Sequence, residues 1–77
     1  MLITIKYFGM LTEVTNCEKE TMNFYGNDIS ELLDMLYIKY SGLKNKDFQV
    51  AQNQELVSIE TKLTSNEIVL MPPFSGG

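Results

Sequence analysis

The chain has 77 residues, which allow one domain with a small hydrophobic core. Its single cysteine excludes an internal disulfide, and the absence of histidine excludes a Ser-His-Asp triad, a Cys-His pair and the usual zinc sites. Six lysines, no arginine and ten acidic residues give a net charge of −4, which argues against nucleic acid as a partner because phosphate contacts require a basic face.

The first residues do not resemble a targeting signal. Residues 1–6, MLITIK, lack the charged segment and the long apolar segment of a signal peptide. Elsewhere no apolar run approaches the length of a membrane span. We therefore expect a cytoplasmic protein that has no membrane as a partner.

Alternating sequence patterns predict a β-hairpin at the start of the chain. Apolar residues at positions 3, 5 and 7 alternate with polar ones, which predicts a half-buried strand over residues 2–8. Residues 9–17 are weakly patterned and predict a connection. Residues 18–24 carry β-favouring and apolar residues two positions apart, so they predict a second strand paired with the first.

The strongest local signal is a helix that begins after Asp28. Asp28 and Glu31 have the spacing of a capping box. Apolar residues then recur at helical spacing and predict an amphipathic helix about four turns long. They are Ile29, Leu32, Leu33, Leu36, Tyr37 and Tyr40. Lys39 complements the helix dipole near the end, and we expect Gly42 to stop the helix in the left-handed conformation.

Three short strands are predicted to follow the helix. Residues 48–51 and 56–60 read as strands, the second with Val57 and Ile59 facing the core. Residues 68–71 form an apolar run that is typical of a central strand. The order ββαβββ, with the last strand beside the first in parallel, predicts an α+β protein of the β-grasp (ubiquitin-like) arrangement. This arrangement has a mixed sheet with one main helix packed on one face. The helix forms a right-handed crossover between the first hairpin and the later strands.

The chain is predicted to end in a tail, residues 74–77, that follows a domain at residues 1–73. Pro72 and Pro73 remove two N–H donors and fix φ near −65°, so the last strand must stop and an extended segment begins. Gly76 and Gly77 have no Cβ atoms, so they can enter a narrow channel and leave the terminal acyl carbon open to a nucleophile. A frayed terminus is the alternative interpretation.

Over its whole length the chain resembles the ubiquitin-like sulfur carriers, and it is most similar to the family of molybdopterin synthase small subunits. The similarity rests on four motifs: YFG and LTE within residues 7–13, SELL and YSGL within 30–43, VAQNQ at 50–54, and LMPPFSGG at 70–77. The pattern Pro-Pro-x-Ser/Thr-Gly-Gly marks this family, whereas the sulfur carrier of the thiamine pathway usually lacks the proline pair.

The resemblance implies a mechanism in which the C-terminus reacts. An E1-like activating enzyme would use ATP to adenylate the Gly77 carboxylate, and a sulfur donor would convert it to a thiocarboxylate. The tail would then enter the large subunit of molybdopterin synthase, within a heterotetramer, and give its sulfur to a pterin precursor during molybdenum cofactor biosynthesis. Gly76 would permit access, and Pro72, Pro73 and Phe74 would set the exit of the tail. The chain itself would bind no cofactor or metal and would supply no catalytic acid or base.

Two positions depart from the family pattern, and two other functions stay open. Thr12 stands where an arginine is usual, and the turn at residues 65–67 is one residue shorter than the common one. The chain could instead be the thiamine-pathway sulfur carrier, against which the proline pair argues. It could also be a ubiquitin-like modifier that is conjugated to lysines.

Other candidate residues have simpler interpretations. Cys17 could carry a persulfide, but its acidic neighbours disfavour the thiolate. The acidic residues at positions 28, 31 and 34 could suggest a metal cluster, yet their spacing fits the cap and solvated face of a helix. The methionines at 22, 35 and 71 are of a residue type that more often fills a core than binds a cofactor.

The parity of the strands predicts an apolar patch on the outer face of the sheet. The core side of the first strand takes the odd positions, which leaves Phe8 outside, and the same argument places Leu56 and Met71 outside. Because the first and last strands are neighbours in a β-grasp sheet, Phe8 and Met71 should meet near the exit of the tail. We expect this patch, continued by Phe74, to bind the large subunit and the activating enzyme in turn.

Overall fold

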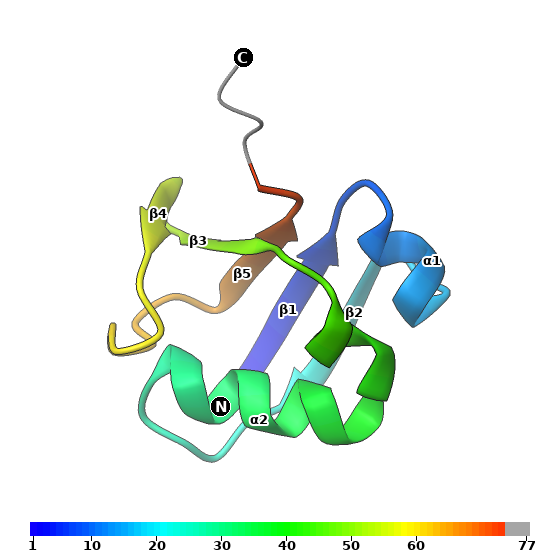
Figure 1. Cartoon of the computed structure of the whole chain (residues 1–77). Helices are drawn as coiled ribbons and strands as arrows, with labels where there is room; N and C mark the ends of the chain where they lie inside the picture. Colours follow the sequence, from blue (N-terminus) through cyan, green and yellow to red (C-terminus); the bar gives the residue numbers. More distant parts are fainter. Residues whose placement is uncertain (74–77) are drawn as a thin grey trace.

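The structure, a computed structural model, describes residues 1–73 (Figure 1). Within these residues the chain forms a five-stranded sheet in the order β2-β1-β5-β3-β4, and one main helix, α2, packs across one face. The strands are β1 (Leu2–Tyr7), β2 (Lys19–Asn23), β3 (Gln49–Gln52), β4 (Glu55–Val57) and β5 (Glu67–Met71). The helices are α1 (Leu11–Thr15), α2 (Ile29–Lys39) and the 3₁₀ helix η1 (Ser41–Asn45). The prediction of a mixed-sheet β-grasp fold is confirmed.

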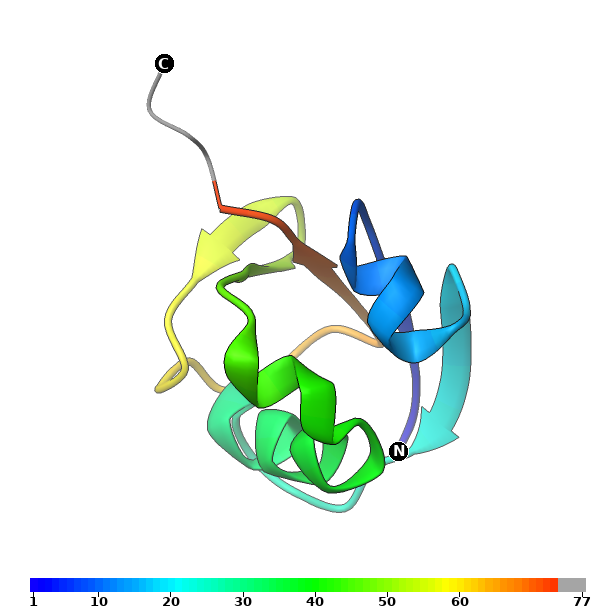
Figure 2. The ribbon, with the colours of Figure 1, turned by 45° about the vertical axis from the view of Figure 1, so that its right-hand side comes forward.

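The last strand, β5, lies in the middle of the sheet, as its apolar sequence predicts. It pairs in parallel with β1, where Ile5 is opposite Ile68, and antiparallel with β3, where Val50 is opposite Leu70. β2 pairs antiparallel with the other edge of β1. Figures 1 and 2 show that β5 ends at the opposite end of the sheet from the N-terminus, beside the turn that joins β1 to α1.

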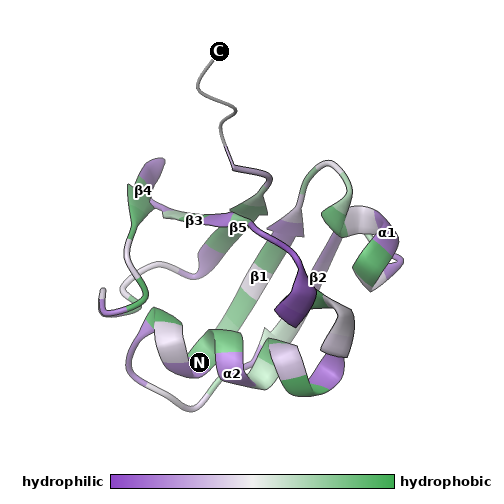
Figure 3. Cartoon of the chain, in the orientation of Figure 1, coloured by the Kyte–Doolittle hydropathy of each residue, from purple (hydrophilic) through white to green (hydrophobic). Residues whose placement is uncertain are grey.

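The core lies between the sheet and α2. Alternate residues of β1 and β5 are buried, and α2 contributes one apolar face, seen in Figure 3 as hydrophobic segments that alternate with polar ones. The residues that are fully buried are Ile3, Ile5, Tyr7, Leu11, Ile29, Leu32, Leu36, Leu43, Ile68 and Leu70. At about 25 cal/mol per Å² of apolar surface, burial of these side chains supplies the main stabilising term of a domain of this size.

The main helix begins as predicted but ends earlier. The Asp28 carboxylate accepts a hydrogen bond from the Glu31 backbone N–H at 2.9 Å, which caps the first turn. The helix stops at Lys39, about three turns long, because Tyr40 has an extended φ of −129°. The prediction that Gly42 ends the helix in the left-handed conformation is wrong, since Gly42 lies inside η1. η1 turns the chain back and buries Leu43 in the core.

Two other sequence predictions need correction. The weakly patterned segment 9–17 contains the short helix α1, which the prediction of a simple connection missed. The strand predicted at 56–60 is only three residues long, and Ile59, expected in the core, is 55% exposed. The chain leaves the sheet after Val57, which is half-buried, and binds the start of α2 instead. There the backbone of Ile59 accepts a hydrogen bond from Ser30 at 2.8 Å.

A buried glutamine holds the loop before the last strand. Gln52 is 5% exposed, and its amide group donates to the Lys62 carbonyl at 3.0 Å. Its side-chain oxygen accepts from the backbone N–H groups of Thr64 at 2.8 Å and Ser65 at 3.2 Å. Ser65 in turn accepts from the N–H of Glu67 at 3.1 Å. The short turn at 65–67 is therefore fixed by side-chain hydrogen bonds rather than by a glycine.

Candidate functional site

The candidate site begins where β5 ends. Met71 is the last residue of β5 and is half-buried, Pro72 is also half-buried, and Pro73 is exposed. Neither proline can donate to the sheet, so the strand ends here as predicted. The predicted site residues Phe74, Gly76 and Gly77 lie outside the described residues, and their roles stay predictions.

A hollow on the outer face of the sheet brings together the three apolar residues that strand parity singled out. Phe8 and Leu56 are each 50% exposed, and Met71 lies between the elements that carry them. The lining is completed by Ala51, Asn53, Gln54, Ser65, Glu67 and Val69. The hollow is thus lined by both apolar and polar residues, and it includes Met71, the residue directly before Pro72. Such a surface is suited to a protein partner.

The register of β3 adds Ala51 to the hollow, a residue that the sequence did not predict there. Ala51 lies between Val69 of β5 and Leu56 of β4, so it joins their side chains on the outer face. Sequence reasoning missed Ala51, because the register of β3 is set by its partners. The turn between β3 and β4 is tight, with Asn53 and Gln54 both at positive φ, as in a two-residue hairpin.

The charges around the hollow are mostly at the surface. Lys6 Nζ lies 3.3 Å from Glu67 Oε2, and both side chains are close to half exposed. An ion pair this exposed contributes about 0–1 kcal/mol. Because the pair is this weak, a basic group of a partner can compete with Lys6 for the Glu67 carboxylate.

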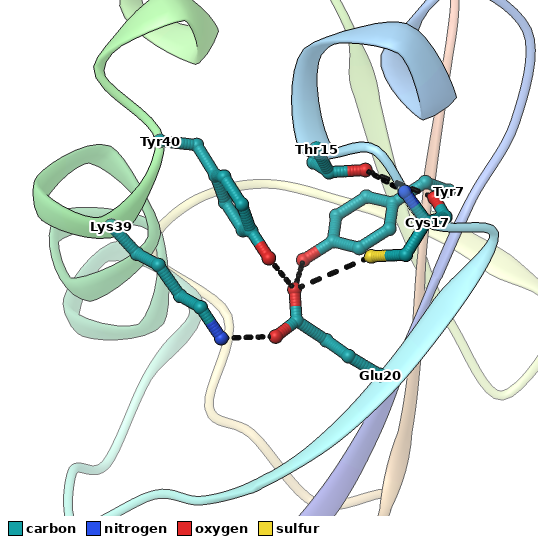
Figure 4. A network of polar contacts seen from close by, with 6 residues as sticks. All are labelled: Tyr7, Thr15, Cys17, Glu20, Lys39 and Tyr40. Atoms are coloured by element: carbon teal, nitrogen blue, oxygen red, sulfur yellow. Dashed lines mark hydrogen bonds and ion pairs between the residues drawn. The ribbon is translucent and has the colours of Figure 1, made fainter.

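A separate polar cluster lies on the helix-covered side of the sheet (Figure 4). The hydroxyl groups of Tyr7 and Tyr40 each donate to Glu20 Oε2 at 2.6 Å, and Cys17 Sγ lies 3.9 Å from the same oxygen. Lys39 Nζ donates to the other carboxylate oxygen. The cluster joins β1, β2 and the end of α2. Sequence patterns could not predict it, because its members are far apart in the chain.

The environment of this cluster shifts the pKa of three of its groups. Burial acts to raise the pKa of Glu20, but hydrogen bonds from Lys39, Tyr40 and Tyr7 outweigh it, so the pKa lies below its ordinary value. Burial, followed by the hydrogen bond to the Glu20 carboxylate, raises the pKa of Tyr7 and Tyr40 far above the ordinary value of a tyrosine. At neutral pH one carboxylate thus accepts from two neutral hydroxyl groups and a lysine.

The other candidates take structural places. Cys17 is half-buried, with its sulfur directed at the Glu20 carboxylate. Asp28 caps α2, and in the part of the chain that the structure describes no three His, Cys, Asp or Glu side chains gather as a metal site would need. Met22 and Met35 pack against the core as expected, whereas Met71 lines the hollow. None of the helices within residues 1–73 is long and apolar enough to cross a membrane.

Comparison with known proteins identifies the family. The model of the ThiS family matches residues 5–77. The chain belongs to the ThiS family. This confirms the resemblance to ubiquitin-like sulfur carriers that the sequence motifs carried.

Solved structures similar to this ThiS-family chain fall into two groups. A candidate molybdopterin converting factor subunit 1 from Pyrococcus furiosus has a TM-score of 0.87 at 17% identity, over 96% of this chain and 99% of that one. The small archaeal modifier protein 1 of Haloferax volcanii has a TM-score of 0.80 at 22% identity, with full coverage of both chains. At these identities the likeness shows the fold alone.

One similar structure is closer in sequence. A complex of subunits 1 and 2 of the molybdopterin-converting factor from Helicobacter pylori contains a chain 30% identical to this one, with 100% of both chains covered and a TM-score of 0.70. In that structure a ThiS-like fold is therefore bound to a second subunit.

Proposed function

We propose that this ThiS-family sulfur carrier is the small subunit of a cytoplasmic molybdopterin synthase. The observation that carries the proposal is the 30% identity, over both whole chains, to a protein solved as part of a two-subunit molybdopterin-converting factor. The sequence PPFSGG at 72–77 supports it, since the proline pair is typical of this subunit and unusual in the thiamine-pathway carrier.

In the proposed reaction the chemistry takes place on the Gly77 carboxylate. An E1-like enzyme joins this carboxylate to the α-phosphate of ATP and releases pyrophosphate, which turns a poor acyl group into a mixed anhydride. A sulfur donor at the hydrosulfide level attacks the acyl carbon, AMP leaves, and the product is a thiocarboxylate. In the large subunit the thiocarboxylate sulfur bonds to a carbon of the pterin precursor, and water then cleaves the acyl–sulfur bond, which restores the Gly77 carboxylate. The proposal assigns the catalytic groups to the partners, and the absence of histidine, the most frequent general acid or base, from this chain agrees with that assignment.

The described residues would contribute docking and exit. The hollow formed by Phe8, Leu56, Met71 and their neighbours would hold first the activating enzyme and later the large subunit. Pro72 and Pro73 would direct the chain away from the sheet beside that hollow. In both complexes the tail would then start beside the bound surface and point in the same direction from it.

The test is to follow the mass of the carrier during activation. With ATP, activating enzyme and a sulfur source, we expect a gain equal to the exchange of one oxygen for sulfur, mapped to the C-terminal peptide. Addition of the large subunit and the pterin precursor should reverse it. Deletion of Gly77 should abolish the gain with an unchanged free energy of unfolding, because residues 1–73 are untouched.

A matched variant separates the carboxylate from the thiol. Cys17→Ser should gain the same mass as the natural chain, whereas a sulfur mapped to the Cys17 peptide would support a persulfide carrier and refute the proposal. Transfer of sulfur only to a thiazole synthase would indicate the thiamine-pathway carrier. Isopeptide bonds to lysines without any transfer to a pterin would indicate a protein modifier, a function suggested by the fold shared with small archaeal modifier protein 1.

A further inference from the structure

The turn between β1 and α1 lies directly against the residue that begins the exit of the tail. Gly9 has φ +61°, in the left-handed region. A Cβ atom added to Gly9 would lie 2.6 Å from Cγ and 3.3 Å from Cδ of Pro72. Real Cβ contacts essentially never fall below 3.0 Å. The ring of Pro72 cannot rotate away as a flexible side chain could, so either the turn or Pro72 would have to move.

Hydrogen bonds hold the turn in place on both sides. The N–H of Phe8 donates to the Leu70 carbonyl at 3.0 Å, which ties the turn to β5 two residues before Pro72. The Gly9 carbonyl accepts from the backbone N–H of Thr12 at 3.2 Å and from its hydroxyl at 2.9 Å. Because the turn is fixed to both β5 and α1, a larger residue at position 9 would displace Pro72.

We propose that Gly9 is a positioning residue that seats Pro72 and thereby fixes the direction in which the tail leaves the sheet. The inference rests on the proposed function, because the direction matters only if the end of the tail must reach an active site. Thr12, where the family usually has arginine, supports the seat through its hydroxyl group. A misplacement of about 1 Å in a reacting group can lower a rate by about 100-fold, so a contact at the base of the tail can control the chemistry at its end.

A double-mutant cycle between positions 9 and 72 tests the contact. We measure adenylation of the full chain by its activating enzyme, with kcat and KM determined separately. Gly9→Ala should lower kcat by about 10- to 100-fold and change KM by less than about threefold, because the residues of the hollow are unaltered. In the Pro72→Ala background, adding Gly9→Ala should lower kcat by less than about threefold.

The cycle removes backbone strain from the comparison. Alanine at position 9 has the same unfavourable φ in both backgrounds, whereas the ring atoms at 2.6 Å and 3.3 Å exist only with Pro72. Gly9→Asn gives a second variant that tolerates the left-handed region but keeps the Cβ contact, so it should lose rate like Gly9→Ala while unfolding at a higher temperature. Equal losses of kcat in the two backgrounds would overturn the proposal.

Two controls separate positioning from general destabilisation. Gly26→Ala also introduces a close contact, 2.4 Å from Phe24 Cζ, but in the connection from β2 to α2, at the other end of the sheet (Figure 1). It should lower stability and leave kcat unchanged in the folded protein. In the natural chain, nuclear Overhauser contacts should join the Gly9 α-protons to the Pro72 ring, and their absence would refute the seat. A natural chain that is never adenylated would instead refute the proposed function.

Discussion

Glu20→Ala is expected to destabilise the protein strongly, although glutamates on strands are usually replaceable. Tyr7 is 2% exposed, and the change removes the carboxylate that accepts the hydrogen bond from its hydroxyl group. A buried donor left without an acceptor costs about 1–3 kcal/mol. Tyr40 is half-buried and loses the same acceptor at 2.6 Å, at a cost of about 1 kcal/mol. The Lys39 side chain is 50% exposed, so loss of its ion pair adds about 0–1 kcal/mol. The sum is about 2–5 kcal/mol.

This loss is large for a chain of this length. Stabilities of about 0.05–0.15 kcal/mol per residue correspond to roughly 4–12 kcal/mol for the whole domain. A shift of about 4–8 °C in Tm accompanies each kcal/mol in small domains, so a loss of 3 kcal/mol lowers Tm by roughly 12–24 °C. Urea and thermal unfolding followed by circular dichroism would measure both quantities.

The matched control is Glu18→Ala. Glu18 is exposed, lies two residues away and makes no side-chain hydrogen bond or ion pair within residues 1–73. Its replacement should change stability by less than about 0.5 kcal/mol. If the Glu20→Ala variant has the same Tm and free energy of unfolding as the Glu18→Ala variant, the reasoning is refuted. Water would then replace Glu20 as the acceptor of the tyrosine hydroxyl groups at no cost.

Further predictions concern pH and the hollow. In the folded protein the pKa of Glu20 lies below its ordinary value of 4.5. The stability that the Glu20 carboxylate contributes is therefore complete above pH 4.5 and is lost as the pH falls through the pKa of the folded state. Glu20→Gln should remove this part of the unfolding in acid. The raised pKa of the two tyrosines predicts a further loss of stability as pH rises above the ordinary tyrosine value of 10.0, visible in alkaline unfolding curves. Phe8→Ser, Leu56→Ser and Met71→Ser should each weaken binding of the large subunit by about 1–3 kcal/mol in calorimetric titrations, with a smaller change in stability. Ile38→Ser on α2, where the side chain is 87% exposed, is the control that should bind normally; unchanged affinity in all three hollow variants would place the interface on another face.

Local patterns predict much of the fold. The alternation in β1 and the helical stripe after Asp28 are properties of consecutive residues, so they identify the elements and their buried faces. The apolar run of β5 also predicts its central position correctly. The prediction for Ile59 is wrong because β4 is a short edge strand, and the chain leaves it to bind the start of α2 before residue 59 can face the core.

The site is predictable to a more limited extent. Parity places Phe8, Leu56 and Met71 on one face. The neighbourhood of the first and last strands brings Phe8 and Met71 together, whereas Leu56 joins them only through the pairing of β3 with both β5 and β4. The seat of Pro72 on Gly9 could not be found in this way, because it depends on the path of a turn and on the left-handed backbone at one residue. The Glu20 cluster was missed for a different reason, because it is made by tertiary contacts among elements that no local pattern relates.

The central place of β5 governs how the protein can be made. Until residues 67–71 have left the ribosome, the β1–β2 and β3–β4 hairpins have no strand between them, and isolated two-stranded hairpins are at best marginally stable. The nascent chain therefore folds late, when the segment that leads into the tail has already been synthesised. A product truncated before β5 lacks the strand that joins the two hairpins, so it stays unfolded and open to removal by cellular proteases.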